Sequence, residues 1–550
     1  MIRAPRSCLT VTRPLTVTLA LALTLALAAC GGGTTREPLP PTEPAALLAT
    51  LDDLAAFGEK RCGTDAGRQA AAYVAARMTA AGLEDVHEEP FAFPQHTVSA
   101  ASFTVAVDGA PAAAAFDVFE ASGGGTAEGA AVVYVGSARP SDLQGVDLTG
   151  KVAMVERDQT IHRSLQYRHV TDAGAAAMLY LSTAPDNLRQ VGSVRLTWEA
   201  QSTIPAVTIG AVDGAAIKAA LAAGAAVTAS FAVVTTAVPA QGQNVVGRVR
   251  GTDEASGLLL VGAHYDTWFV GSTDNGGGVA ALLAVAERIA AGPPPRYGIV
   301  FVAYDGEELA LYGGYHFLRT HVTEAGEPIL AALNFEVPAA KETSLLGLAY
   351  SGDAPLEEAL RGAGLSSVYP LFLGMEGVPS LFGGIIPTDI QGLYRANIAV
   401  ASTASSSSWY HTTADTPDKV DIDALAPAVD AFAATLLALG DAAPATLRTN
   451  DPALWLAQVT VAPSAAGGPL AVTAAITDAA GAPQAGAPAH ATLLYDDFFL
   501  ALEADATTDA AGQVTFSFPA DQAALGSGRR FVHVTAGPAY PLVEVIAAVP

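Results

Sequence analysis

The chain of 550 residues carries 54 acidic and 28 basic side chains, which gives a formal net charge of −26. This acidic excess argues against a nucleic acid as partner and favours a solvated acidic surface. Only 15% of the residues are charged and 51% are hydrophobic, so the composition is that of a globular protein and not of a disordered one. The length predicts several domains.

The first 30 residues have the pattern of an export signal. Three arginines lie in residues 1–14, and a short apolar run, LTVTLALALTLALAAC, follows at 15–30. The run ends in Leu27-Ala28-Ala29-Cys30, which resembles a bacterial lipobox. The resemblance implies a signal peptide at 1–29, lipidation of Cys30, and a flexible tether over 30–45. The alternative is an ordinary cleaved signal peptide with a coincidental cysteine.

These features predict an exported bacterial lipoprotein that is held in the cell envelope by its N-terminal lipid. Gly31, rather than Asp, follows the cysteine. By resemblance to bacterial sorting rules, this favours the outer membrane where the organism has one.

Replacing Cys30 by alanine should therefore release the mature protein from the membrane fraction or leave an unprocessed precursor. The catalytic fold should be unaffected, because the tether separates it from the anchor. Fractionation and mass spectrometry of the N-terminus check this result. Membrane retention with normal processing would contradict the lipobox interpretation.

Cysteine usage predicts no intramolecular disulfide in the mature chain. Of three cysteines, Cys8 and Cys30 belong to the targeting segment, which leaves Cys62. No activating group stands near Cys62 in the sequence, so we expect a structural residue in a loop rather than a thiol nucleophile.

Residues 46–95 and 96–240 differ in their sequence pattern. AALLATLDDLAAFG and DAGRQAAAYVAARMTAAGL carry apolar residues at helical spacing, with Gly82 at an expected C-cap, and VHEEPFAF indicates a strand. Short Val-rich runs then follow: AAVVYVG, GKVAMVE, AAAMLYLS and IPAVTIG. They predict a β-rich domain over 96–240, on whose surface we expect His162 and His169.

Strand–helix alternation resumes over 241–445. A helix is expected after an N-cap at Asp274 or Asn275, with an apolar face that includes Val279 and Leu282. IDALAPAVDAFAATLLALG (422–440) predicts a closing helix with a glycine C-cap. Over 451–550, short alternating strands separated by Gly and Asp turns predict an Ig-like β-sandwich. No motif there names a partner, and His490 and His533 have no neighbour at metal-ligand spacing.

Histidine, aspartate and glutamate side chains that could bind a metal follow apolar, strand-like runs between residues 258 and 411. The runs are LLLVGAHYD, GIVFVAYDGEE, ILAALNFE and NIAVASTASSSSWYH. The loops after strand C-termini converge on one edge of an open α/β sheet. Two imidazoles and several carboxylates that meet there would form a site suited to zinc. These residues are His264, Asp274, Glu307, Glu308, Glu336 and His411.

Five segments resemble the di-zinc aminopeptidase family that also contains glutamate carboxypeptidase II and the transferrin receptor. They are GAHYDT (262–267), STDNGGGVAALLAVAERI (272–289), FVAYDGEELALYGG (301–314), LNFEV (333–337) and WYHTTADTPDKVD (409–421). Residues 96–240 resemble a protease-associated domain, which larger family members carry as an insertion at this place. The resemblance implies a mixed α/β sheet sandwiched by helices, with this β-rich insertion and the C-terminal β-sandwich.

The resemblance also implies a role for each residue. His264 would bind one zinc ion, Asp274 would bridge two, and His411 would complete the second. Glu308 and Glu336 would each give a carboxylate to one ion, and an acidified bridging water would be the nucleophile. Three further roles are a general base, Glu307, an orienting partner of the His264 imidazole, Asp266, and a hydrogen-bond donor to the oxyanion, Tyr410.

The sequence departs from the family pattern at two places. Glu336 stands where most such aminopeptidases carry Asp, and Pro338 follows shortly after. Thr388-Asp389-Ile390 keeps the acidic residue of a Ser-Asp-His-like segment but lacks its histidine. Arg395 is a candidate for reading a substrate carboxylate, although a solvent-facing arginine is the default interpretation.

The sequence therefore predicts a membrane-anchored zinc peptidase with two Zn²⁺ ions and a peptide substrate, of the aminopeptidase type. Two alternatives stay open: a carboxypeptidase or other amide hydrolase on the same scaffold, and a non-catalytic, receptor-like binding protein. No GxSxG elbow, P-loop or GxGxxG motif supports another enzyme class.

Overall fold

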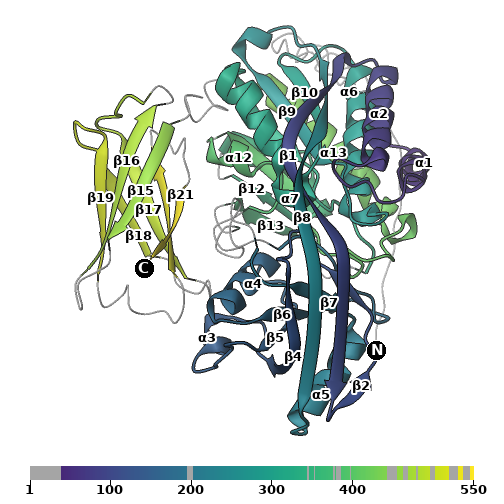
Figure 1. The fold of residues 1–550 in the computed structure, drawn as a ribbon. Coiled ribbons are helices and arrows are strands. Elements are labelled where there is room, and N and C mark those ends of the chain that lie inside the picture. Colours follow the sequence, from purple (N-terminus) through teal and green to yellow (C-terminus); the bar gives the residue numbers. More distant parts are fainter. Residues whose placement is uncertain are drawn as a thin grey trace, which may run out of the picture. The chain divides into compact units, whose positions relative to one another are not determined.

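The computed structural model (Figure 1) describes residues 39–194, 202–342, 346–351, 354–375, 378, 386–396, 398–442, 455–462, 469–478, 481–495, 502–519, 530–536 and 545–549. The predicted signal peptide, Cys30 and most of the tether lie outside these residues. Of the described part, residues 41–549 belong to one compact unit.

A mixed sheet flanked by helices contains the predicted site residues, and its architecture is the one that the sequence predicts. Its centre is parallel: β14 (Ala399–Thr403), β11 (Ile329–Asn334), β9 (Leu258–His264) and β10 (Gly298–Tyr304) lie side by side in this order. β12 (Gly347–Tyr350) pairs antiparallel with β14 and parallel with β13 (Leu371–Gly374). Strands this apolar are buried on both faces, which explains their continuous hydrophobic runs.

Helices cover both faces of this sheet. On one face, Leu258, Leu260, Val300 and Val302 pack with Phe317 and other residues of the following helices. These helices are α8 (Tyr312–Phe317), η3 (Leu318–Glu324) and α12 (Gln391–Arg395). On the other face, α6 (Gly277–Ala290) contacts β9 and β10, and α1 (Pro44–Ala55), α2 (Asp65–Ala80) and α13 (Ile422–Asp441) contact α6. Shorter helical elements are η1 (Glu254–Ser256), η2 (Ser272–Gly276), α7 (Glu307–Ala310), α9 (Ala354–Gly362), α10 (Leu365–Val368) and η5 (Pro417–Lys419).

The predicted insertion continues this sheet. β1 (Glu84–Val107) and β8 (Val227–Val249) pair antiparallel along almost their whole length, and β8 also pairs with β10 and β4 (Gly125–Tyr134). From β4, the order runs through β5 (Val152–Glu156), β6 (Ala177–Leu181) and β7 (Ala206–Ile209) to β3 (Phe116–Val118). As far as the described residues show, the sheet has 14 strands, with β2 (Ala110–Ala112) paired to β1. Helices α3 (Pro140–Leu143), α4 (Arg163–Asp172) and α5 (Ala211–Ala222) belong to this part.

The described residues between 455 and 549 form two small antiparallel sheets. One contains β15 (Trp455–Ala462), β16 (Leu470–Asp478) and β19 (Gln513–Phe518). The other contains β17 (Pro488–Tyr495), β18 (Leu502–Thr507), β20 (Arg530–Ala536) and β21 (Val545–Val549). Alternate residues of β16 and β19 are buried in a core shared with β17 and β20. This pattern agrees with a β-sandwich, and the Ig-like assignment stays a prediction.

Among the described helices, α13 is long and apolar enough to cross a membrane by length and composition. Its buried residues include Leu425, Val429, Phe432 and Leu436, and it contacts α1, α6, α9 and α10. This packing is that of a core helix.

Three local predictions are wrong. Neither Asp274 nor Asn275 caps α6, which begins at Gly277, because both residues have non-helical dihedral angles in the preceding η2 segment. Gly440 lies inside α13, which ends at Asp441. His169 is buried rather than at the surface, and its Nδ1 lies 2.7 Å from the carbonyl oxygen of Ala138, which satisfies this polar atom. By contrast, Cys62 is buried in a loop beside Phe91 and Phe93, as expected for a structural residue, and burial raises the pKa of its thiol.

A buried histidine links η3 to the long strands. His321 Nε2 lies 2.7 Å from Glu89 Oε1, and its Nδ1 lies 3.1 Å from Glu327 Oε1. Burial alone would lower the pKa of His321, but the two carboxylates raise it to about 9. Glu89 also contacts the more exposed His87 at 3.0 Å, and Glu327 contacts Arg248.

This cluster predicts a pH-dependent stability. Since the folded pKa of His321 is raised, its stabilisation is complete below about pH 6.5 and is lost as the pH rises through about 9. We expect His321→Gln to lower the unfolding free energy at pH 6 by about 3 kcal/mol and by much less at pH 10. Urea unfolding at both pH values measures this, with His87→Gln as the matched control of small effect. The same loss at both pH values would refute the linkage.

Candidate metal centre

The predicted ligands lie at the C-terminal ends of the parallel strands. β9 ends at His264, and Glu307 and Glu308 open α7 just after β10. Glu336 follows β11 by two residues, and His411 lies in the loop after β14. Parallel strands bring these ends to one edge of the sheet, so residues far apart in sequence meet there.

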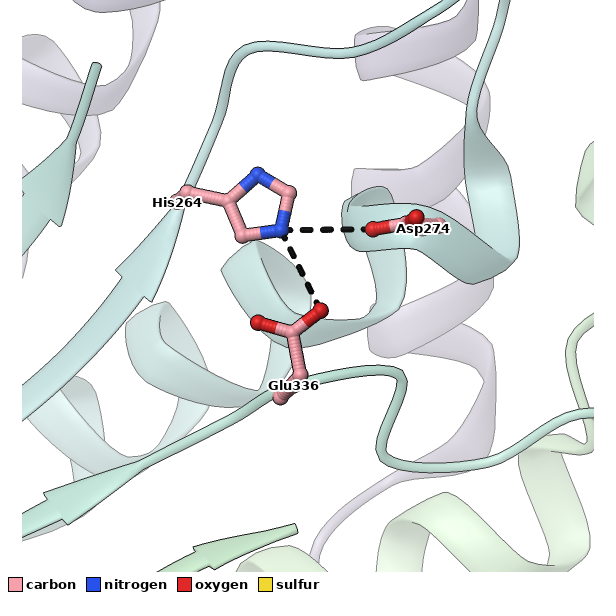
Figure 2. Close-up of side chains that lie close together, drawn as sticks. All are labelled: His264, Asp274 and Glu336. Carbon is pink, nitrogen blue, oxygen red and sulfur yellow. Dashed lines mark ion pairs between the residues drawn. The ribbon is translucent and has the colours of Figure 1, made fainter. Parts of the chain in front are cut away.

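Two groups of side chains in the described part of the chain could hold a metal ion, and they share Asp274. In the first, His264 Nε2 lies 3.2 Å from Asp274 Oδ1 and 3.5 Å from Glu336 Oε1 (Figure 2). Figure 2 shows the imidazole and both carboxylates pointing toward one another from three separate segments.

In the second group, His411 Nε2 lies 3.1 Å from Asp274 Oδ2 and 3.0 Å from Glu308 Oε1. The two oxygens of Asp274 therefore face different imidazoles. This is the arrangement that a bridging carboxylate requires. The two groups contain all five predicted ligands.

The donor atoms fit a pair of divalent cations. Each of the five residues keeps a buried nitrogen or oxygen that has no hydrogen-bond partner, a state that proteins tolerate where a ligand completes the site. The atoms are His264 Nε2, Asp274 Oδ1, Glu308 Oε1, Glu336 Oε2 and His411 Nε2. Three carboxylates and two imidazoles form a nitrogen and oxygen set of the kind that zinc accepts, and metal ions would balance the buried negative charge.

Glu307 lies beside this centre without belonging to either group. Its side chain is half-buried. Burial, together with the charges of Glu336 and Glu308, raises the pKa of Glu307 well above its usual range, and His264 opposes the shift. A carboxylate that is held near the ligands and has a raised proton affinity suits a proton acceptor.

Asp266 contacts both His264 and the segment that carries the two glutamates. His264 Nδ1 lies 3.0 Å from the main-chain oxygen of Asp266 and 3.6 Å from its carboxylate. The Asp266 carboxylate instead accepts hydrogen bonds from the backbone N–H groups of Glu307 and Glu308, both at 3.2 Å. Asp266 thus orients the imidazole through its backbone and positions the two glutamates through its side chain.

Three supporting residues carry no sequence signal that we recognised. Trp268 Nε1 donates to Glu308 Oε2 at 2.8 Å, which leaves Oε1 directed at His411. Asp415 accepts hydrogen bonds from the backbone N–H groups of Thr273 (2.8 Å) and Asp274 (3.2 Å). Thr403 Oγ1 accepts from the backbone N–H of Glu336 at 2.8 Å. WYHTTAD contains Asp415, but only the fold shows what it contacts.

Tyr410 and Asp389 lie near the centre. The Tyr410 ring stacks on the His411 ring, with centroids 3.7 Å apart, and its hydroxyl accepts a hydrogen bond from Arg163 at 3.3 Å. Asp389 is buried, and burial together with neighbouring acidic groups raises its pKa well above the usual range. The side chain of Arg395 lies outside the described residues.

Comparison with known proteins agrees with this geometry. Residues 244–436 match the family model of peptidase family M28, and residues 110–217 match that of the PA domain. Residues 244–436 are therefore similar to the peptidases of family M28. All five predicted ligands and Glu307 lie within the M28 match. The PA match lies within the predicted insertion and confirms the protease-associated assignment.

Relatives of the M28 domain include two enzymes of different specificity. The "probable glutamate carboxypeptidase VP8" of Zea mays is 26% identical over 361 residues, which cover 53% of this chain and 50% of that protein. The "probable leucine aminopeptidase 2" of Aspergillus fumigatus is 24% identical over 322 residues, 58% of this chain and 62% of that protein. The chain thus spans half to three-fifths of these two relatives.

Two solved structures are similar to this chain in fold. The peptidase M28 precursor of Shewanella amazonensis superposes with a TM-score of 0.60 at 22% identity, over 72% of this chain and 93% of that one. A zinc aminopeptidase of Bacillus subtilis gives a TM-score of 0.56 at 21% identity, over 75% and 99%. These likenesses confirm the predicted α/β architecture.

Proposed function

We propose that this chain is an exported di-zinc metallopeptidase that removes N-terminal residues from peptides. The observation that carries the proposal is the pair of donor groups sharing Asp274, with Glu307 beside them. Membrane attachment through a lipid on Cys30 rests on the lipobox resemblance alone.

His264, Asp274 and Glu336 would hold one ion, and Asp274, Glu308 and His411 the other. When bound, the ions supply an acidified water and polarise the scissile carbonyl group. Glu307 accepts the proton of the attacking water and passes it to the leaving amine. Tyr410 would donate its hydroxyl proton toward the oxyanion. The hydrogen bond that this hydroxyl accepts from Arg163 supports the role, because it leaves the hydroxyl proton available.

One observation favours a second candidate, a carboxypeptidase. Arg163 contacts the Tyr410 hydroxyl, and the Arg157 guanidinium lies over the Tyr410 ring, 5.2 Å from its centroid. Two guanidinium groups beside the centre could bind a substrate carboxylate. The names of the relatives include both types. A receptor-like role is disfavoured, because a binding protein needs no carboxylate base beside its ligands.

A metal assay combined with a substrate panel tests the proposal. We expect about two zinc ions per chain, loss of activity on chelation, and recovery with zinc or cobalt. An unblocked aminoacyl substrate should be cleaved, and its N-acetylated counterpart should not. Preference for the blocked peptide with a free C-terminus would select the carboxypeptidase, and active enzyme without metal would overturn the mechanism.

A further inference from the structure

Among the described residues of the inserted PA domain, a short segment contacts two of the predicted metal ligands. This segment, Gln190–Ser193, follows β6 and is held in the insertion by Glu120, whose backbone N–H donates to the Gly192 carbonyl and whose carbonyl accepts from Val194 N–H. No predicted ligand lies in it. Its polar groups nevertheless reach two residues of the second donor group.

The contacts with His411 fix both the backbone and the ring. His411 Nδ1 lies 3.0 Å from the Val191 carbonyl oxygen, and the Val191 N–H donates to the His411 carbonyl, also at 3.0 Å. A carbonyl can only accept, so Nδ1 must carry the proton. The free electron pair is thereby placed on Nε2, the atom that faces Asp274 and Glu308.

Further bonds tie the segment to neighbouring parts of the same site. Ser193 Oγ donates to the Glu308 carbonyl at 2.7 Å, and Gln190 Nε2 donates to the Tyr410 carbonyl at 3.3 Å. Arg163 Nε donates to the Ser193 carbonyl at 2.9 Å. Gly192 permits this, because its φ is +144° and a Cβ there would lie 2.4 Å from Arg163 Nε.

The first donor group differs. His264 Nδ1 lies close to the main-chain oxygen of Asp266, and the Glu336 N–H donates to Thr403 Oγ1. Both partners lie outside the insertion. We infer that the segment 190–193 of the insertion is a positioning element for the second metal ion. The segment sets the tautomer and the position of His411, whereas binding of the first ion does not depend on it. This inference rests on the proposed two-metal centre.

Zinc titration of chelated protein tests it, using calorimetry with two resolved sites and the absorption of bound cobalt as a second readout. In Gly192→Ala, the added methyl group and the left-handed φ displace the 191–192 peptide. We expect the second ion to bind about 10- to 100-fold more weakly, the range known for partners of ligating histidines, and the first within about twofold of wild type. Ser193→Ala should weaken the second ion in the same direction but less.

Lys218→Ala is the control, because it breaks an insertion ion pair with Glu156 away from the segment and should leave both affinities unchanged. If Gly192→Ala fails to fold by circular dichroism, Ser193→Ala decides. Wild-type affinity at both sites in the folded variants, or equal weakening of both, overturns the inference while the proposed function stands. Absence of metal binding by the wild type would instead defeat the proposed function.

Discussion

Glu307→Gln should keep both zinc ions and lose about 10²- to 10⁴-fold in kcat, the range typical of general-base catalysis, which corresponds to roughly 3–5 kcal/mol in the barrier. The amide keeps the size of the side chain but cannot accept the proton of water. The Asp266 carboxylate continues to hold the backbone N–H groups of residues 307 and 308, so the turn should not move. Metal analysis and steady-state kinetics on the same preparation measure both properties.

Glu308→Gln is the matched comparison. A neutral amide is a poor ligand, so this variant should lose occupancy of the second ion, where Glu308 Oε1 lies 3.0 Å from His411 Nε2. If Glu307→Gln lost metal and Glu308→Gln kept it, the two roles would be exchanged. If both variants were fully active, the pair would not belong to the reaction centre.

Asp274→Asn should have the largest effect on metal content. Burial would raise the pKa of Asp274, but the contacts with His264 and His411 outweigh it and hold this pKa below its usual range. Its two oxygens face both imidazoles, and one substitution therefore weakens both donor groups. We expect neither ion to be retained after dialysis, and activity at the level of chelated enzyme.

Asp415→Asn is the graded control for that experiment. Asp415 accepts a hydrogen bond from the backbone N–H of Asp274 but is not a member of either donor group. Both ions should therefore still bind, with affinities about 10- to 100-fold lower. One ion bound at full affinity in Asp274→Asn would show that Asp274 does not bridge.

The site was largely predictable because strand ends in a parallel sheet meet. His264, Glu308, Glu336 and His411 each follow an apolar run, and the runs alone place them at one edge. The predicted N-cap of α6 was wrong because Asp274, although it is of a residue type that often caps helices, directs its carboxylate toward the two imidazoles. The helix begins later, at Gly277.

The supporting contacts were not predictable from pattern. The hydrogen bonds of Trp268 with Glu308 and of Asp415 with the Asp274 backbone join segments that are more than 39 residues apart in sequence. Neither Trp268 nor Asp415 lies in a sequence pattern that indicates such a contact. Val191 acts through its main chain, which no residue type reveals. The burial of His169 depends on a carbonyl 31 residues away.

The two long strands β1 and β8 change how the insertion can move. Both pass the predicted borders near residues 95 and 240 while still bonded to each other, with Phe93 opposite Ala240 and His96 opposite Ala237. Domains usually move about linkers that few contacts cross. Here the continuous β1–β8 hydrogen-bond ladder crosses the boundary between the insertion and the rest of the chain. Any opening of the insertion must therefore bend or break this ladder, so the insertion is expected to move less than a domain that is joined by flexible linkers.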